Sequence, residues 1–153
     1  MRAVVQRAIG ASVTVDGRAV GRIAHGLVVY VGVASGDGPA DADYLADKVI
    51  NLRIFPDESG RMNRSLVDRC GDDPDTGLLA ISQFTLLADT RKGRRPSYNA
   101  AESPERAMVL FDRFVGEASR RVRVETGRFG EHMHVGYVND GPVTILVDSR
   151  RQF

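Results

Sequence analysis

The stretch SQFTLLAD, residues 82–89, offers hydroxyl and amide groups directly after an apolar run. Ser82, Gln83 and Thr85 surround Phe84, so side chains that could orient a polar substrate are concentrated at neighbouring positions. The hydroxyl of Thr85 could also attack an ester, although a threonine is a weak nucleophile unless a base lies within hydrogen-bond reach. The spacing alone favours a simpler interpretation, the end of a strand with alternating polar residues.

A basic cluster follows in TRKGRRPS, formed by Arg91, Lys92, Arg94 and Arg95 around a glycine. Most charge runs are solvated loops, but cations just beyond a polar strand end can also form a phosphate-binding edge. The sequence leaves both interpretations open. Because no aromatic residues are interleaved with the cations, the cluster does not resemble a platform that coats single-stranded RNA.

A third polar stretch, NDGPVT, separates two apolar runs near the end of the chain. Asn139, Asp140, Gly141 and Pro142 each favour chain reversal for their own steric or hydrogen-bonding reason, which predicts a tight turn. The alternative is a rigid backbone device in which Gly141 and Pro142 present carbonyls to a ligand. Taken alone, these residues favour the turn.

Other familiar chemistry is missing from the sequence. His132 and His134 would share one face of a strand, but no nearby Cys or acidic residue completes a ligand set, so we predict no metal. The loops of nucleotide-binding proteins and the motifs of common hydrolases are also missing, and we predict no cofactor. The single cysteine, Cys70, and an N-terminal apolar run too short for a signal or membrane span predict a cytoplasmic protein with no membrane contact.

The chain has the length and composition of one globular domain, which we predict to cover residues 1–153. Its 21 basic and 20 acidic side chains leave a net charge of +1. Contact with a nucleic acid would therefore depend on a local patch and not on the charge of the whole molecule.

Hydrophobic periodicity predicts the elements that must position the polar stretches. Helices are predicted over about 40–55 and from Ser103-Pro104 onward, and Asp16-Gly17 is a strong hairpin signal. The apolar stripe of the second helix comprises Ala107, Leu110, Phe111, Phe114 and Ala118. Strands are predicted over 2–9, 11–24, 26–34, 77–89, 121–127, 131–138 and 143–149. This order predicts an α/β fold in which layered β-sheets, in a barrel-like β/β/α arrangement, carry two main helices on one side.

Beyond these local patterns, the chain resembles the D-aminoacyl-tRNA deacylase (D-tyrosyl-tRNA deacylase) family, the chirality proofreaders of translation. The resemblance rests on segments in the family's order: MRAVVQR, ASVTVDG, LRIF, GRMNRSL, SQFTLLAD, KGRRPSY, TGRFGEHM and NDGPVT. SQFTLLA and NDGPVT are the diagnostic pair. The resemblance implies a cytoplasmic enzyme that hydrolyses the ester at the 3′ end of D-aminoacyl-tRNA, and also acts on glycine misattached to tRNA-Ala.

The resemblance also implies a role for NDGPVT. In the family the Gly-Pro bond is cis and enters the active site of the other subunit, so a homodimer with active sites at its interface is implied. Gly141 and Pro142 would present carbonyls to the amino group of the substrate and leave no room for the side chain of an L-amino acid. Arg7 would hold their orientation, and Asn139 would be a further substrate-binding residue.

Catalysis is implied at Ser82, Gln83, Phe84 and Thr85, and two mechanisms remain. Either Thr85 is the nucleophile, or the amides around Phe84 and Thr85 bind the oxyanion while the 2′-hydroxyl of the tRNA helps to activate water. We prefer the second mechanism, because the sequence offers no evident histidine base near the site. Ser82 and Gln83 would position the terminal nucleotide, Met133 would line its pocket, and the basic cluster would contact acceptor-stem phosphates.

Two other functions compete with this interpretation. One is a non-catalytic RNA-binding domain that keeps the scaffold and the basic cluster. The other is a small-molecule hydrolase that uses Thr85 on an unrelated ester. Release of the amino acid from D-tyrosyl-tRNA but not from L-tyrosyl-tRNA would separate both from the deacylase.

Overall fold

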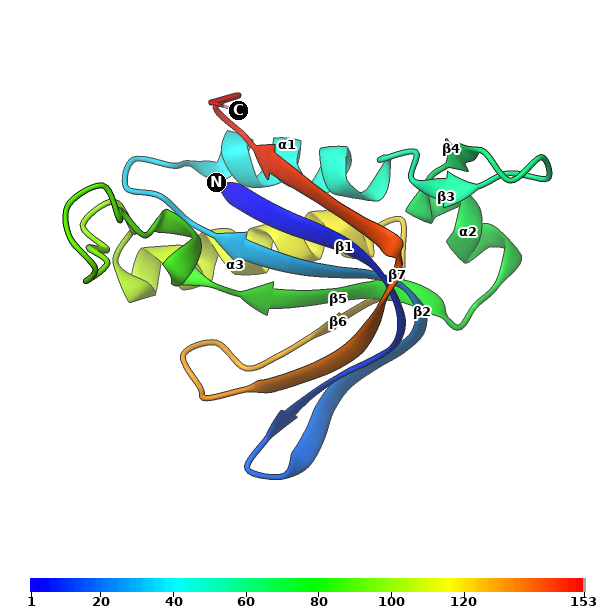
Figure 1. Cartoon of the computed structure of the whole chain (residues 1–153), viewed down its shortest axis with the longest axis horizontal. Coiled ribbons are helices and arrows are strands. Elements are labelled where there is room, and N and C mark those ends of the chain that lie inside the picture. The colour runs from blue at the N-terminus through cyan, green and yellow to red at the C-terminus, as the bar shows by residue number, and fades with distance from the viewer. Residues whose placement is uncertain (153) are drawn as a thin grey trace.

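The protein is described by a computed structural model that covers residues 1–152 (Figure 1). The strands are β1 (Arg2–Val15), β2 (Arg18–Gly32), β3 (Phe55–Pro56), β4 (Met62–Arg64), β5 (Thr76–Ser82), β6 (Val124–Thr126) and β7 (His134–Asp148). The helices are α1 (Pro39–Ile50), α2 (Leu66–Asp72), α3 (Pro104–Ser119) and the short 3-10 helix η1 (Phe84–Leu87).

A five-stranded sheet in the order β6-β5-β2-β1-β7 forms the centre of the molecule, and β3 and β4 form a small separate sheet. β1 pairs antiparallel with β2 and β7, whereas β2 with β5 and β5 with β6 are parallel. The hairpin predicted between β1 and β2 is confirmed. Asp16 and Gly17 both have positive φ, at 49° and 74°, as the tight turns that match strand twist require.

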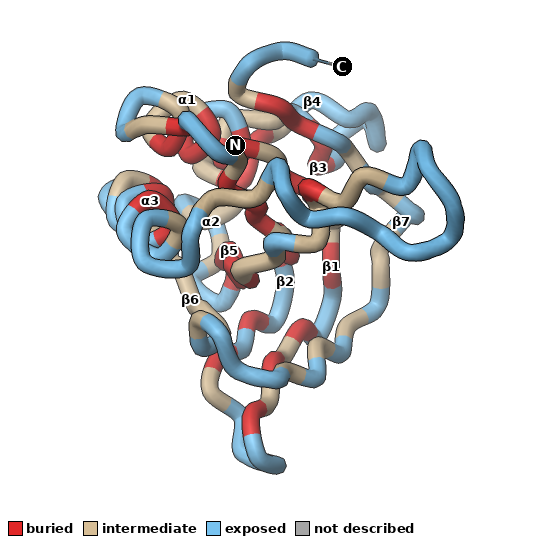
Figure 2. The backbone as a smooth tube through the Cα atoms, turned by 90° about the vertical axis from the view of Figure 1, so that its left-hand side faces the viewer, coloured by how far each residue is buried: buried red, intermediate tan, exposed pale blue. Residues whose placement is uncertain are grey.

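α1 and α3 pack against each other and cover the same face of the sheet (Figure 1). The larger hydrophobic core lies beneath them, and Figure 2 shows buried residues concentrated there. Leu27 and Val29 of β2 point into this core with Leu45 of α1 and Phe114 of α3, all fully buried. The predicted α/β fold with two main helices on one side is confirmed.

The opposite face of the sheet holds a smaller core around Val13, Val28 and Leu79. Met133, in the segment before β7, and Tyr137, near the start of β7, pack against this core. The alternation of Leu27 and Val28 between the two cores is the period-two pattern of a strand buried on both faces. Figure 1 shows the long β1–β2 hairpin and the first half of β7 curling away from the helices, which gives the sheet its layered, barrel-like shape.

Several predicted boundaries were wrong. The predicted strand 2–9 continues into 11–15, and together they form β1. Residues 18–24 and most of 26–34 form its hairpin partner, β2. α1 ends at Ile50 and not near residue 55. α2 was missed because it lies in a segment rich in polar residues. Ser65 starts it, since its hydroxyl accepts from Asp68 N at 3.2 Å and Asp68 accepts from Ser65 N at 2.8 Å.

β7 contradicts the predicted hairpin turn at NDGPVT. Both halves of β7 run in the same direction along β1, and the register passes from Ala8↔Asn139 to Gln6↔Thr144. Residues 140–143 therefore form a bulge opposite Arg7. Proline has no N–H to donate to the hydrogen bonds between strands, so Pro142 is accommodated in a bulge. The bulge interrupts the pairing locally, and β7 continues on both sides of it.

None of the helices in residues 1–152 is long and apolar enough to cross a membrane.

Candidate active site

The polar stretch at residues 82–85 lies where β5 passes into η1, and not in a strand that runs to Asp89 as predicted. Gln83 N makes the last bond to the neighbouring strand, to Val31 O at 2.8 Å, and the chain then turns into a helix. Gly32 makes this turn possible: a Cβ there would lie 2.6 Å from Leu87 Cδ2 and 2.9 Å from Gln83 O. The junction thus depends on a close approach that only glycine permits.

A cleft of about 490 Å³ opens beside this junction. Ser82, Gln83 and Phe84 lie along it, together with Met133 from the segment before β7 and Phe111 from α3. The structure therefore brings together four of the predicted site residues, Met133 among them despite its distance in the sequence. Gly127 leaves the space that Met133 occupies, because a Cβ at Gly127 would collide with the Met133 sulfur.

Thr85 stands apart from the other three residues of its motif. It is half-buried and does not line the cleft. Its hydroxyl accepts a hydrogen bond from Gln83 Nε2, and an amide is not a base that could activate a nucleophile.

The backbone at the start of η1 offers two donors, on Phe84, which lines the cleft, and on Thr85 next to it. Its first turn is closed by Leu86 N, which donates to Gln83 O at 3.3 Å, so the N–H groups of Phe84 and Thr85 precede the internal bonds of the helix. Such N–H groups can stabilise a negative charge that develops on a substrate oxygen.

His132, Glu102 and Glu131 also line the cleft, so the expectation that no histidine lies near the site was wrong. The His132 ring is exposed and contacts the His134 ring edge to face, with centroids 5.0 Å apart. Glu102 accepts from Ser103 N at 2.9 Å, and this hydrogen bond lowers the pKa of its carboxyl group, which makes the carboxylate a weaker base. No local pattern in the sequence signals these residues, because loops bring them to the cleft.

The Gly141–Pro142 bulge is held by its neighbours in β1. The peptide bond between Gly141 and Pro142 is cis, as the family resemblance implied, and both residues are exposed. With its amide oriented to satisfy both ends, Asn139 donates to Arg7 O and Val143 O, each at 3.1 Å. Asn139 thus closes the neck of the bulge, which favours a positioning role over direct substrate contact.

Within one chain the bulge is remote from the cleft. The bulge lies opposite Arg7 of β1. Arg7 is paired with Leu27 of β2, and Leu27 is paired with Leu78 of β5. Ser82 lies four residues beyond Leu78 along β5. Three strand spacings across the sheet and four residues along it amount to roughly 20 Å. A single chain therefore does not bring Gly141 and Pro142 to Gln83.

The basic cluster occupies an exposed loop that is closed at its neck by Asp89 and Ser97. Asp89 N donates to Ser97 O at 2.8 Å, and Ser97 N donates to Asp89 O at 3.0 Å. Arg91 forms two hydrogen bonds with the Asp89 carboxylate, at 2.9 and 2.7 Å, which hold the pKa of that carboxyl well below its usual range. Tyr98, just after the neck, contacts the Phe84 ring with centroids 5.0 Å apart. The loop thus lies beside the cleft.

Within residues 1–152, no group of three or more His, Cys, Asp or Glu side chains is arranged to hold a metal ion.

Solved structures identify the class of fold. A protein described as "c-Myc DNA Unwinding Element Binding Protein" superposes with a TM-score of 0.88, at 36% identity over 97% of this chain and 98% of that one. A second, described as a probable eukaryotic D-amino acid tRNA deacylase, has a TM-score of 0.80 over 96% of this chain and 98% of that one. At 18% identity, this second likeness shows the fold alone.

Sequence comparison then identifies the family. The family model for D-Tyr-tRNA(Tyr) deacylase matches residues 4–148. A relative from Kosmotoga olearia is 56% identical over 153 residues, and one from Syntrophomonas wolfei is 54% identical over 154 residues. Both are named D-aminoacyl-tRNA deacylase, and each alignment covers 100% of both chains. The chain belongs to the D-Tyr-tRNA(Tyr) deacylase family, as the sequence motifs implied.

Proposed function

We propose that the protein hydrolyses the ester bond of D-aminoacyl-tRNA in the cytoplasm, releasing the free D-amino acid and the tRNA. The observation that carries this proposal is the meeting of Ser82, Gln83, Phe84 and Met133 in one cleft of a chain from this family. Its near relatives bear the name of this activity. The proposed enzyme is a carboxylic ester hydrolase that needs no cofactor.

The geometry favours catalysis by the backbone over a threonine nucleophile. The N–H groups of Phe84 and Thr85 bind the oxyanion that forms when water adds to the ester carbonyl. The ribose oxygen leaves and takes a proton, and the neighbouring 2′-hydroxyl of the tRNA assists the activation of water. Ser82 and Gln83 position the terminal nucleotide, and Met133 lines its pocket. The Thr85 hydroxyl has no basic partner in its hydrogen bond with Gln83, which argues against its direct attack.

Chirality is read by Gly141 and Pro142 of a second subunit. Their carbonyls receive the substrate's α-ammonium group, so the side chain of an L-amino acid would collide with them. The exposure of both residues and their distance from the cleft of their own chain support this arrangement. Glycine has no side chain to collide, so glycine misattached to tRNA-Ala is a substrate by the same logic.

The free edge of the sheet supports assembly into a two-fold homodimer with active sites at the interface. β7 is a 15-residue edge strand. It exposes Val138 and Leu146 at 64% and 59%, and Ile9 of the adjoining strand is 43% exposed. A long edge strand with exposed apolar side chains is a surface that proteins normally cover.

The basic cluster gives the tRNA its second contact. Phe84 and Tyr98 link this loop to the mouth of the cleft, so a 3′ end in the cleft brings acceptor-stem phosphates near Lys92, Arg94 and Arg95. Such contacts hold a nucleic acid without reading its sequence.

The decisive experiment compares D-tyrosyl-tRNA with L-tyrosyl-tRNA. The protein should release the amino acid from the D-substrate and leave the L-substrate intact. Equal release from both, or release from neither, would refute the proposed function.

A non-catalytic nucleic-acid-binding domain is the second candidate. It is favoured by the relative with 36% identity, which is described as a DNA-unwinding-element-binding protein. Tight binding of tRNA without release of the D-amino acid would support this alternative.

Mixing two impaired variants tests the cross-subunit site. In the proposed dimer, a heterodimer of Gln83→Ala and Gly141→Ala chains contains one intact site and one doubly altered site. Mixing the two variants and letting their subunits exchange should therefore restore activity that neither variant has alone. An active monomer in sedimentation would contradict the arrangement.

A further inference from the structure

Two large aromatic rings lie exposed beside the mouth of the cleft. Phe84 is 57% exposed and Tyr98 is 38% exposed. Their rings meet edge to face, with centroids 5.0 Å apart and planes inclined at 67°. Phe84 lines the cleft, so Tyr98 continues the apolar surface of the cleft towards the basic cluster.

The backbone beneath both rings is held by hydrogen bonds. Phe84 begins η1, whose first turn is closed by Leu86 N donating to Gln83 O at 3.3 Å. Tyr98 begins a turn in which its carbonyl accepts from Ala101 N at 2.9 Å. The two rings therefore project from fixed positions.

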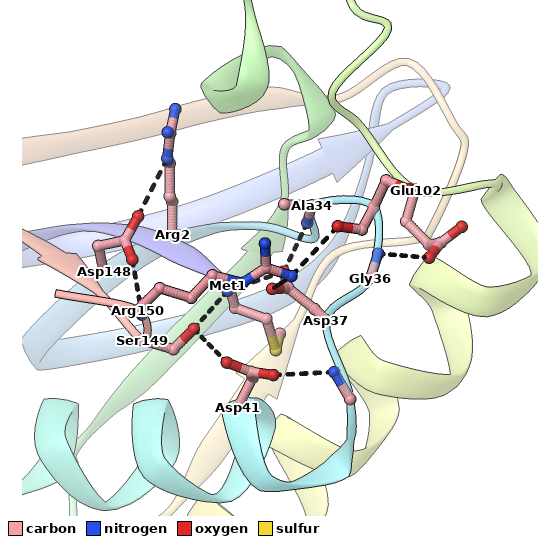
Figure 3. A network of polar contacts seen from close by, with 12 residues as sticks. Met1, Arg2, Ala34, Gly36, Asp37, Asp41, Glu102, Asp148, Ser149 and Arg150 are labelled. Atoms are coloured by element: carbon pink, nitrogen blue, oxygen red, sulfur yellow. Dashed lines mark hydrogen bonds and ion pairs between the residues drawn. The ribbon is translucent and has the colours of Figure 1, made fainter. Parts of the chain in front are cut away.

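The segment after Tyr98 is also tied to the loop that follows β2 (Figure 3). Gly36 N of that loop donates to the Glu102 carboxylate at 3.4 Å. The loop itself is closed by Asp37, whose carboxylate accepts from Ala34 N at 2.6 Å. A tyrosine ring has only two rotatable bonds, so on such a backbone it loses little conformational entropy when it binds a ligand.

The aromatic pair lies between the cleft and the basic cluster. Phe84 lines the cleft, and Tyr98 directly follows Ser97, which closes the neck of the basic loop with Asp89. A second hollow of about 520 Å³ lies in that loop and is lined by Asp89, Arg91, Lys92, Arg95 and Ser97. A strand of nucleic acid whose last nucleotide fills the cleft, and whose phosphates reach this hollow, must pass the two rings.

We propose that Phe84 and Tyr98 form a stacking site for the base of the nucleotide that precedes the terminal adenosine of the tRNA. The inference rests on the proposed function, because it takes the 3′ end to lie in the cleft. An edge-to-face contact covers at most one face of one ring, so the exposed pair keeps aromatic surface for a base. Stacking holds any base without reading its identity, because every base has a π face.

The sequence hides this site because its two rings come from either side of the basic cluster. Phe84 precedes the cluster and Tyr98 follows it, and the bridge between Asp89 and Ser97 brings them together. The aromatics that the cluster itself lacks are thus supplied by the segments that flank it.

The inference is tested by the length of the substrate. Hydrolysis of the D-tyrosyl ester of adenosine is compared with that of the D-tyrosyl ester of cytidylyl-adenosine, the last two nucleotides of tRNA. The ratio of the two kcat/KM values isolates the contribution of the added nucleotide, because a loss within the cleft affects both substrates. This ratio should be about ten or more for the wild type.

Variants and a modified substrate then assign that contribution. Tyr98→Ala and Phe84→Ala should each lower the ratio at least threefold, whereas Tyr98→Phe, which keeps the ring, should retain it. A dinucleotide ester that lacks the cytosine base but keeps its phosphate should give the wild type a ratio as low as that of Tyr98→Ala. Tyr44→Ala is the matched control, since Tyr44 lies on α1 and lines neither hollow, and its ratio should equal that of the wild type.

The outcomes separate the stacking site from the proposed function. Release of D-tyrosine from both esters, with a ratio near one or a ratio that Tyr98→Ala leaves unchanged, would overturn the stacking site alone. An abasic ester hydrolysed as well as the complete dinucleotide would also overturn it and would assign the gain to the phosphate. Dissociation of the dimer by Tyr98→Ala in sedimentation, at an unchanged ratio, would assign the rings to the subunit interface instead. Release from neither ester would refute the proposed function and the inference with it.

Discussion

Arg7 forms an ion pair with Asp140 across the bulge in β7, with Nε 2.8 Å from Oδ2. Its Nη1 also donates to Ile54 O at 2.8 Å, which ties the bulge to the segment after α1. The Arg7 side chain is only 13% exposed, whereas that of Asp140 is 41% exposed. A planar guanidinium can hold two differently directed acceptors at once, which a lysine ammonium does less well. These two contacts support the proposed role of Arg7 in holding the orientation of Gly141 and Pro142.

We predict that Arg7→Lys weakens the hydrolysis of D-tyrosyl-tRNA more than it weakens folding. The free energy of unfolding should fall by about 1 kcal/mol, because Asp140 is substantially solvated and the pair is partly screened. The rate of D-tyrosyl-tRNA hydrolysis should fall at least tenfold if the proposed cross-subunit contact is correct. Urea unfolding and single-turnover hydrolysis measure the two effects. Arg113→Lys, at an exposed pair with Asp43, is the control and should leave hydrolysis unchanged.

The sequence predicted well those features that local physics determines. The Asp16-Gly17 hairpin and the start of α3 at Pro104 follow from turn chemistry and from the fixed φ of proline. It failed where a distant neighbour decides the local structure. The run after Ser82 has strand propensity, yet η1 forms because Gly32 lets both Leu86 and Leu87 pack toward one side. In a strand these adjacent side chains would point to opposite faces.

The candidate site shows the same division. Gln83 and Phe84 could be predicted because they are adjacent in one motif. His132 could not, because only the packing of the segment before β7 against the smaller core brings it to the cleft. The bulge at Gly141 was predicted as a turn because its residues favour reversal, and nothing local reveals that β1 continues as a partner on both sides of it.

Gly32→Ala tests the junction between β5 and η1. The new Cβ would lie 2.6 Å from Leu87 Cδ2 and 3.1 Å from Leu86 Cβ, so η1 must shift. We expect a loss of about 1–3 kcal/mol in the free energy of unfolding, as for other overpacked cores, and a loss of hydrolysis. Gly116→Ala is the matched control, because Gly116 lies in α3 with nothing within 4 Å of its Cβ position. That control should be neutral or stabilising by up to about 1 kcal/mol, and an equal loss in both variants would contradict the packing argument.

Thr85→Val separates the two catalytic mechanisms. The substitution keeps the shape of the side chain and the backbone N–H but removes the hydroxyl that accepts from Gln83. If the backbone binds the oxyanion, kcat/KM should fall by less than about tenfold. A fall of several orders of magnitude in kcat, with substrate binding retained, would instead identify Thr85 as the nucleophile.

The stability of the fold should decrease in acid partly through Asp41. Burial opposes ionisation of this carboxyl, but the Ser149 hydroxyl, the Gly38 amide and the nearby positive charges lower its pKa below the ordinary value. A carboxyl with a lowered pKa in the folded state stabilises the fold above its unfolded pKa of about 3.9, and this contribution is lost as the pH falls through the folded value. Unfolding measured from neutral pH down to about pH 2 should therefore show a smaller acid-dependent loss in Asp41→Asn than in the wild type. Parallel curves for the two proteins would exclude this role for Asp41.

Replacing Arg94 and Arg95 together by glutamine should weaken tRNA binding without changing the chemical step. Both side chains are exposed in the loop beside the cleft, and they would contact phosphates and not bases. KM for full-length D-tyrosyl-tRNA should rise, whereas hydrolysis of a short D-tyrosyl-adenosine ester should be unaffected, because that substrate fills only the cleft. The slope of a plot of log K for tRNA binding against log salt concentration should become shallower by about one unit for each phosphate that the variant no longer neutralises. Replacing exposed Arg120 at the C-terminal end of α3 is the control for net charge, since the residues of α3 that line the cleft, Pro104, Ala107 and Phe111, lie in its first half. If Arg120→Gln raises KM as much per charge removed, the effect belongs to the charge of the whole molecule and the basic cluster does not bind the tRNA.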